Sequence, residues 1–456
     1  MRRVVKVSRI RIIITIIVVV LTTLLTGCTG KEPNEIAYVV ALGIDSTDDD
    51  NYKITIQYAN TTQISGGASE SGGKAGSEIV DNVTIEAPNI YAGVGLANNI
   101  VSKSFSMSHA KLIVFSKEMA EKGVKDMIET LVRSEEIRPD VFIAVANTTA
   151  NDYLTSVNPE MEVNPAQYYQ LIYQKNQLVG IPDGQLREFF TGLYTDNYDS
   201  ILPVAGVIEG SGGNSQNDDK GQSKDGQNEG SEGSSESLDS FESKSSDDKD
   251  ENEKEKDAEK NTSKYEYDIK NYVGGETAIE KKNKAEAIGA AVFEKDKMVG
   301  ELGEVETEIC KILKGDYTYS YLTYYNNDTP DIPITVKTTQ QKKPKYKIDT
   351  DKKTVDIELY IESDLYSLPA DYNVENKIED FERDVANYTS SACTEFINNF
   401  TKKYNSDILK LNEKIKYKFL TNNQYNWFKK NVGWSEYKFS VCTNFKVRRT
   451  GLIVRE

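Results

Sequence analysis

The sequence predicts an α+β protein of about three mixed α/β domains, with antiparallel or mixed sheets and long amphipathic helices. Three observations carry this prediction. Strand and helix patterns alternate through both halves of the 456-residue chain. A run of apolar positions spaced by three or four marks one long helix near the C-terminus. A polar, acidic stretch separates the two halves, and a basic and then apolar segment precedes them.

The first 28 residues have the pattern of a lipoprotein signal. Residues 1–11 carry five basic side chains and no acidic one, and 14 uncharged residues follow from Ile12 to Leu25. A membrane-spanning helix needs ~20 apolar residues, so this shorter run indicates a secretory signal peptide. Leu25-Thr26-Gly27-Cys28 resembles the bacterial lipobox, in which cleavage precedes a cysteine that receives a diacylglyceryl group. We therefore expect lipid attachment at Cys28; an uncleaved anchor or an ordinary cleavage site is the alternative.

The charge and cysteine content limit the class of protein. The chain has a formal net charge of −17, and removal of residues 1–27, with their five basic charges, would leave −22. Nucleic-acid binding requires basic patches, and a chain this acidic is therefore a poor candidate for it. The remaining cysteines, Cys310, Cys393 and Cys442, are far apart and odd in number, which does not indicate a disulfide framework. One pair could form a bridge, but the sequence does not show which.

A composition shift divides the chain. From Glu209 to Lys260 the sequence holds 17 acidic and 7 basic residues, with Leu238 and Phe241 almost its only apolar ones. Such a segment cannot bury enough apolar surface to offset its ordering entropy, so we predict a disordered acidic linker over residues 209–264.

The N-terminal half predicts a mixed α/β region. Residues 34–45 are apolar and β-branched and residues 52–59 alternate in polarity, so the two predict a hairpin. Residues 110–116 and 139–146 predict two further strands, and the helical spacing between them predicts a connecting helix. Asn164, which precedes a proline, predicts another helix start.

The C-terminal half predicts long helices on an antiparallel sheet. Residues 352–363 alternate apolar and acidic side chains, and apolar positions predict a helix from about Val374 to Lys403. Residues 406–411 offer a cap and a second helix. The last strand is predicted at residues 437–449, with Cys442 on its polar face.

The sequence offers no catalytic residue, cofactor site or metal site. His109 is the sole histidine, which removes most zinc and triad arrangements, and we expect it to make a structural hydrogen bond before a strand. Residues 93–98, "GVGLAN", begin like a dinucleotide-binding loop but lack its last glycine and the acidic residue that should follow. No carboxylate pair lies in an apolar setting suited to acid–base catalysis.

Two other motifs are interpreted as structural. Residues 184–194 predict a core helix rather than a ligand site. Tyrosines at positions 317, 319, 321 and 324 could line a surface for sugars or amino acids, but a strand or edge face is the preferred interpretation.

Several blocks together resemble the GerC family, the lipoprotein C subunits of GerA-type nutrient germinant receptors of endospore-forming bacteria. "NEIAYVVALGID" and "YKITIQYAN" resemble its opening strands. The stretch from "TIEAPNIYAGVGLANN" to "IRPDVFIAVA" is the most recognisable block, with His109, Gly123, Arg133 and Arg138 at matching places. "AIGAAVFEKDKMVGEL" and the terminal "WSEYKFSVCTNFKVRRTGLI" resemble later blocks. This chain departs from the family in lacking a tryptophan soon after Cys28 and in its long acidic spacer.

The resemblance implies three α+β domains, lipid on Cys28, and residence on the outer face of the spore inner membrane. It implies an A subunit and a transporter-like B subunit as partners, with no catalysis and no cofactor. Within the motifs, Gly300 and Gly451 are expected to be turn residues. The predicted divisions are a signal peptide at 1–27, a lipidated tether at 28–35, an N-terminal GerC-like region at 36–205, the linker at 209–264, a middle region at 265–334 and a C-terminal α+β domain at 335–456.

Two alternatives to a receptor subunit remain. A lipid-anchored solute-binding protein would have two lobes around one deep polar cleft and would deliver a nutrient to a transporter. An enzyme would need a concave site with perturbed carboxylates, to which the sequence does not point.

Overall fold

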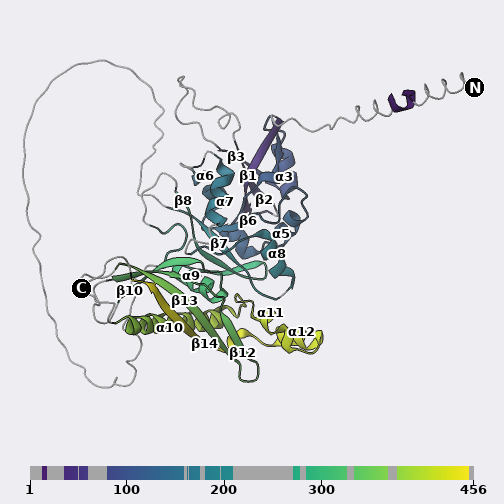
Figure 1. Cartoon of the computed structure of the whole chain (residues 1–456). Coiled ribbons are helices and arrows are strands. Elements are labelled where there is room, and N and C mark those ends of the chain that lie inside the picture. The colour runs from purple at the N-terminus through teal and green to yellow at the C-terminus, as the bar shows by residue number, and fades with distance from the viewer. Residues whose placement is uncertain are drawn as a thin grey trace, which may run out of the picture. The chain divides into compact units, whose positions relative to one another are not determined.

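The described residues form two mixed sheets with helices packed on them (Figure 1). The computed structural model describes residues 13–17, 35–49, 51–59, 80–158, 162, 164–174, 180–195, 197–208, 271–277, 284–325, 333–367 and 377–450. By their contacts these residues fall within one compact unit. The predicted linker at 209–264 and Cys28 lie outside the described residues.

The larger sheet has nine strands in the order β3-β2-β1-β5-β6-β7-β8-β9, with β4 beside β1. Its centre is parallel, from β1 through β5 and β6 to β7, and its two flanks are antiparallel. The strands are β1 (Ile36–Ser46), β2 (Tyr52–Ala59), β3 (Val80–Ala87), β4 (Ser104–Ser106), β5 (Leu112–Ser116), β6 (Phe142–Ala146), β7 (Ile201–Val207), β8 (Ala285–Glu294) and β9 (Lys297–Leu302).

Helices cover both faces of this sheet. Side chains of α3, α4, α5 and α8 pack on one face, and those of α6 and α7 pack on the other. Strands β5 and β6 are buried along their whole length, as expected for parallel strands covered on both sides. The helices are α3 (Ile90–Ala97), α4 (Lys117–Lys122), α5 (Lys125–Val132), α6 (Ala150–Ser156), α7 (Pro165–Gln174) and α8 (Leu186–Thr195).

The predicted hairpin of β1 and β2 is confirmed, and Ile44 lies opposite Ile54. The single helix predicted between β5 and β6 is instead two helices, α4 and α5. The break falls at Gly123, whose φ of 126° disfavours any residue with a side chain. The following Val124 N–H donates to the Asp296 carbonyl at 3.0 Å, so the β8–β9 turn holds the chain at this break.

The pairing of β7 with β8 connects the two halves of the sequence across the insertion. Ile201 lies opposite Val292 and Val207 opposite Ala285. The chain returns at residues 271–277 so close to β7 that a Cβ on Gly206 would overlap the backbone of Gly274 and Gly275. A glycine at 206 is therefore required by this close approach of two backbones.

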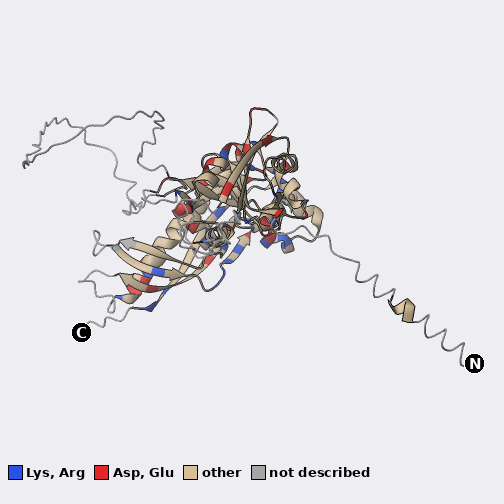
Figure 2. Cartoon of the chain, turned by 90° about the horizontal axis from the view of Figure 1, so that it is seen from above, with Lys and Arg blue, Asp and Glu red and all other residues tan. Residues whose placement is uncertain are grey.

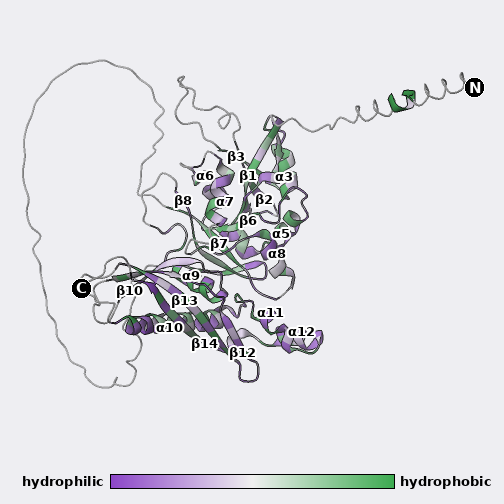
Figure 3. Cartoon of the chain, in the orientation of Figure 1, coloured by the Kyte–Doolittle hydropathy of each residue, from purple (hydrophilic) through white to green (hydrophobic). Residues whose placement is uncertain are grey.

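The smaller sheet has five strands, in the order β10-β11-β13-β12 with β14 beside β13. Buried side chains of α9, α10 and the sheet form its core. The strands are β10 (Tyr319–Tyr325), β11 (Pro333–Thr339), β12 (Lys345–Asp349), β13 (Thr354–Ser367) and β14 (Lys438–Arg449). The helices are α9 (Glu304–Lys314), α10 (Ile378–Tyr404), α11 (Leu411–Ile415) and α12 (Asn422–Asn431), with single turns η3 (Lys416–Lys418) and η4 (Trp434–Glu436). In Figure 3 the outer helix α12 is mostly hydrophilic.

Three predictions for this half need correction. The sheet is not wholly antiparallel, because β14 runs parallel to β13 after the long crossover through α10. The second helix begins at Leu411 rather than near residue 406, because the Asp407 carboxylate accepts the N–H groups of Leu411 and Asn412 and caps the helix there. Gly300 lies within β9 and not in a turn, and its missing side chain admits the Tyr404 hydroxyl.

A row of polar side chains on α10 satisfies the backbone of β14. Ser390, Thr394 and Asn398 are spaced by one helical turn and so share one face of the helix. Their side-chain oxygens accept the N–H groups of Thr443 at 2.9 Å, Val441 at 3.0 Å and Phe439 at 3.1 Å. The edge of β14 that faces α10 is therefore paired with helix side chains rather than left open to another chain.

We predict that Asn398→Ala lowers the free energy of unfolding by about 1–3 kcal/mol, since the Phe439 N–H and carbonyl both lose their side-chain partner. Asn399→Ala, at an exposed position on the same helix, should change it by less than about 0.5 kcal/mol. Urea unfolding of both variants measures the difference. Equal stability of the two variants would contradict the edge-pairing role.

Candidate interaction surface

The structure gives structural roles to the residues that the sequence singled out. His109 ends a short 3-10 turn, η2 (Met107–His109); its Nδ1 lies 3.0 Å from the Ser108 hydroxyl oxygen and its ring packs on Tyr38. Gly93 is buried where α3 meets β2, and a Cβ would lie 2.8 Å from Ile54 Cδ1. The "GVGLAN" motif therefore packs a helix on a sheet, in agreement with the rejection of a cofactor loop.

The other two motifs also agree with the sequence. Residues 184–194 include most of α8, which buries Leu186 and Phe189 as a core helix. Tyr319 and Tyr321 lie on β10, at one end of the smaller sheet, and Tyr321 packs edge-on against Tyr366. The side chain of Tyr324 lies outside the described residues.

The three cysteines of the described region are all free thiols. Cys310 and Cys393 are buried, and burial raises the pKa of Cys310 to about 11 and that of Cys393 to about 12. Cys442 is exposed on β14, on the polar face that the alternation predicted. Both buried thiols stay protonated at neutral pH and are unsuited to nucleophilic chemistry.

A polar junction connects the two sheets. Lys410 Nζ lies 2.5 Å from Glu188 Oε1, and the Asp407 N–H donates to Asp199 Oδ2 at 2.9 Å. Although burial raises the pKa of Glu188, the hydrogen bond from Lys410 and the nearby lysine charges outweigh burial and lower it overall. The hollow that Glu188, Asp199 and Lys410 help to line holds about 10 Å³, enough for about one water molecule and far too small for a nutrient.

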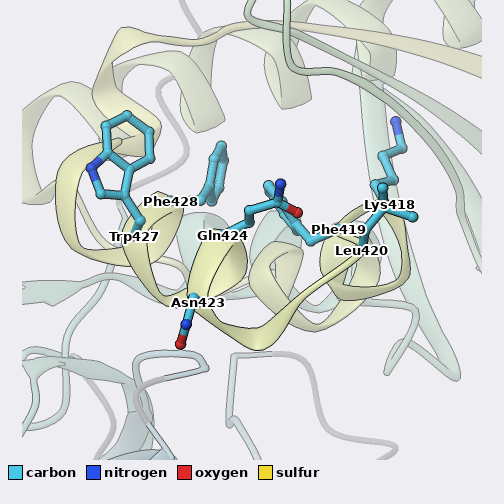
Figure 4. A pocket seen from close by; sticks show the side chains of 7 residues that line it. All are labelled: Lys418, Phe419, Leu420, Asn423, Gln424, Trp427 and Phe428. Atoms are coloured by element: carbon cyan, nitrogen blue, oxygen red, sulfur yellow. The ribbon is translucent and has the colours of Figure 1, made fainter.

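A larger, apolar hollow lies at the C-terminal part of the chain. Its volume is about 650 Å³, and it is lined by Lys418, Phe419, Leu420, Asn423, Gln424, Trp427 and Phe428. Figure 4 shows Trp427 and Phe428 at one end of the hollow, and Phe419 and Leu420 at the other. We call this set the 418–428 hollow. Leu420 is 95% exposed and Trp427 64% exposed, so two large apolar side chains face solvent.

A cluster of aromatic side chains supports the residues that line the hollow. The Phe419 ring lies 5.1 Å from Phe428, which in turn lies 6.0 Å from Trp434. Lys418 Nζ donates to the Ile348 carbonyl, and Lys429 Nζ donates to the Thr195 carbonyl at 3.2 Å. The exposed side chains therefore stand on a packed base, as a protein interaction site requires.

The segment around the hollow is basic in an acidic chain. Residues 410–431 carry six lysines and one glutamate, whereas the whole chain has a net charge of −17. Elsewhere acidic and basic residues are interspersed along the described elements (Figure 2). Lys418 lines the hollow, whereas Lys410 is paired with Glu188. The segment still has more basic than acidic residues, and this balance beside exposed apolar side chains favours an acidic partner.

Sequence reasoning missed this surface. The available signal was the placement of both tryptophans, Trp427 and Trp434, in a lysine-rich segment. The sequence alone does not show that Trp434 is buried and Trp427 exposed, since the two are seven residues apart in different elements.

Within the described residues, no group of three or more His, Cys, Asp or Glu side chains could hold a metal ion. Among the same residues, no helix is long and apolar enough to cross a membrane.

Comparison with known families covers both halves of the chain. A model described as "Spore germination protein N-terminal domain" matches residues 30–207, and a model described as "Spore germination B3/ GerAC like, C-terminal" matches residues 288–451. The chain belongs to the GerC family of germinant-receptor C subunits. This GerC-family assignment confirms the resemblance found in the sequence, and the family is not a known enzyme family.

Individual relatives come from Bacillus subtilis (strain 168). Spore germination protein KC is 26% identical over 35% of this chain and 42% of its own length, and putative spore germination protein YfkR is 29% identical over 32% and 37%. This GerC-family chain thus spans about two fifths of the curated relatives it matches. A solved structure, "Crystal Structure of the GerBC protein", aligns over 89% of this chain and 96% of its own, with a TM-score of 0.47 and 15% identity.

We predict a pH dependence of stability that arises at Asp407. Burial raises the pKa of this carboxyl from its usual 3.8 to about 7, against the opposing effect of the Asn412 and Leu411 N–H groups. The folded protein therefore keeps a proton here that the unfolded chain has released, so the contribution to stability falls as the pH rises from about 4 to about 7. Urea unfolding across this range should show the difference between wild type and Asp407→Ala shrinking with rising pH. A constant difference would contradict the prediction.

Proposed function

We propose that this chain is a lipid-anchored, non-catalytic C subunit of a nutrient germinant receptor that contributes to receptor assembly and to the germinant response. It would lie on the outer face of the spore inner membrane, with A and B receptor subunits as partners. The observation that carries the proposal is the match of GerC-family models on both sides of the acidic insertion. The small size of the polar junction hollow gives no support to a solute-binding protein.

The proposed anchor is a diacylglyceryl group on Cys28. Each buried methylene of a lipid chain contributes ~0.8 kcal/mol, and two chains hold a protein stably on a bilayer. The basic residues 1–11, the 14-residue apolar run and the lipobox-like residues before Cys28 support this modification.

The proposed subunit contact is the 418–428 hollow. Large exposed apolar side chains over a packed base are the groups that dominate binding energy in protein interfaces. The surrounding lysines would favour a partner surface that pairs apolar side chains with acidic ones.

We predict that Cys28→Ala abolishes lipid modification and cleavage, because the thiol is the group that is acylated. Mass spectrometry of the N-terminal peptide should find wild type beginning at a lipidated Cys28 and the variant retaining residues 1–27. Cys442→Ala, which removes an exposed thiol elsewhere, should keep the lipid. Membrane retention by itself does not discriminate, since an unprocessed variant keeps its apolar run. An unmodified Cys28 in the wild type would overturn the anchor.

We predict that Leu420→Asp combined with Trp427→Ala lowers recovery of A and B subunits about 30-fold in co-purification from detergent-solubilised spore inner membranes. This factor corresponds to the ~2 kcal/mol typical of a hot-spot residue. Leu171→Asp, a change at an exposed leucine on α7, is the matched control and should leave recovery unchanged. Circular dichroism should show both variants folded. Equal recovery with both variants would rule out this hollow as the contact.

A further inference from the structure

The start of β1 lies beside an exposed apolar turn. Ile36, the first residue of β1, is paired in parallel with Ser104 of β4. The next residue of β4, Phe105, donates its N–H to the Asn98 side chain at 2.8 Å. Asn98 caps the C-terminal end of α3. The end of α3 and the turn at residues 98–103 are therefore held against the point where the chain enters the large sheet.

Two large apolar side chains project into solvent here, one from the end of α3 and one from the turn after it. Leu96 is 49% exposed and Ile100 is 69% exposed. The helical hydrogen bonding continues past α3, with the Ile100 N–H donating to the Ala97 carbonyl at 3.0 Å. Leu96 and Ile100 are thus one helical turn apart and share one face. The opposite face of α3, including Val94 and Ala97, is buried on the sheet, so the helix is apolar on both sides.

The same part of the chain is free of negative charge. Residues 87–117 contain no aspartate or glutamate and include three lysines and His109, in a chain of net charge −17. Two acidic groups lie near it in the described contacts. The Glu136 carboxylate accepts the Met107 N–H at 2.6 Å, and Asp81 acts electrostatically on Tyr58, whose ring packs 5.2 Å from that of Phe105. An apolar turn within a segment that lacks acidic residues suits the surface of an anionic bilayer.

The length of the tether limits how far this turn can be from the lipid. Residues 28–35 span at most about 28 Å when fully extended. Paired strands lie about 5 Å apart, and the four residues from Ile100 to Ser104 add at most about 14 Å. Ile100 therefore lies within about 20 Å of the end of the tether, so a lipid on Cys28 would allow this turn to reach the bilayer surface.

From this geometry we propose that Leu96 at the end of α3 and Ile100 in the turn after it form a membrane-contacting surface, which inserts these two side chains at the headgroup level of the bilayer that carries the Cys28 lipid. This inference rests on the proposed lipid anchor. Such a contact sets the orientation of the subunit, because attachment at α3 as well as at the lipid removes free rotation about the tether.

The test uses the mature lipidated chain, beginning at Cys28, in vesicles of phosphatidylethanolamine and phosphatidylglycerol. In a Cys442→Ser background, Ile100→Cys is labelled with an environment-sensitive NBD dye. The matched control is Leu420→Cys with the same dye, at the exposed leucine of the 418–428 hollow. The two buried thiols, Cys310 and Cys393, are protected from labelling in the folded protein. Quenching by nitroxide-labelled lipids reports contact of each dye with the bilayer.

The expected result is at least twofold quenching at position 100, with less than 1.2-fold quenching at position 420. Vesicle flotation, scored separately, tests the anchor itself: a chain that does not float overturns the proposed anchor and this surface with it. A floating chain with an unquenched label at position 100 overturns the membrane-contacting surface and leaves the anchor intact. Blue-shifted emission from the dye at position 100 without quenching by the nitroxide lipid would indicate contact with protein instead. That result would also overturn the proposal.

Discussion

The antiparallel pairing of β7 with β8 is the interaction on which the rest of the structure depends. These strands lie on either side of the long insertion, and their pairing joins the parallel centre of the large sheet to the C-terminal half. Closing so long a connection costs little more entropy than closing a shorter one, because the cost grows only with the logarithm of length. The demanding requirement is local: the backbones at Gly206 and Gly274 approach so closely that only glycine fits.

The position of the smaller sheet depends on that pairing. Strand β9 leads directly into α9, which packs on the smaller sheet, and the Asp407 and Lys410 contacts to Asp199 and Glu188 hold the two sheets together. The hydrogen bonds and charge pairs of this junction leave room for about one water molecule. The polar junction is thus used for structural cohesion, and the exposed apolar surfaces lie elsewhere.

Two such surfaces suit a subunit of a membrane-bound assembly. The turn after α3 lies beside the start of β1 and thus near the proposed lipid, whereas the 418–428 hollow is set in a lysine-rich segment of the C-terminal half. Each combines exposed apolar side chains with a local excess of basic over acidic residues, against the acidic average of the chain. A protein with this charge distribution can stay soluble over most of its surface and still present defined contact sites.

The sequence by itself determined the local elements and the family. Alternation predicted the buried face of β13 and helical spacing predicted α10. The rejection of "GVGLAN" as a cofactor loop agrees with its position at the end of α3. These features depend on neighbours in the chain, which periodicity records. Tertiary contacts decided three other features. The parallel β13–β14 pair depends on α10, the break at Gly123 on Asp296, and the position of Gly300 in a strand on Tyr404. Tertiary contacts also decided the exposure of Leu420 and Trp427, because burial depends on residues distant in sequence that no local pattern encodes.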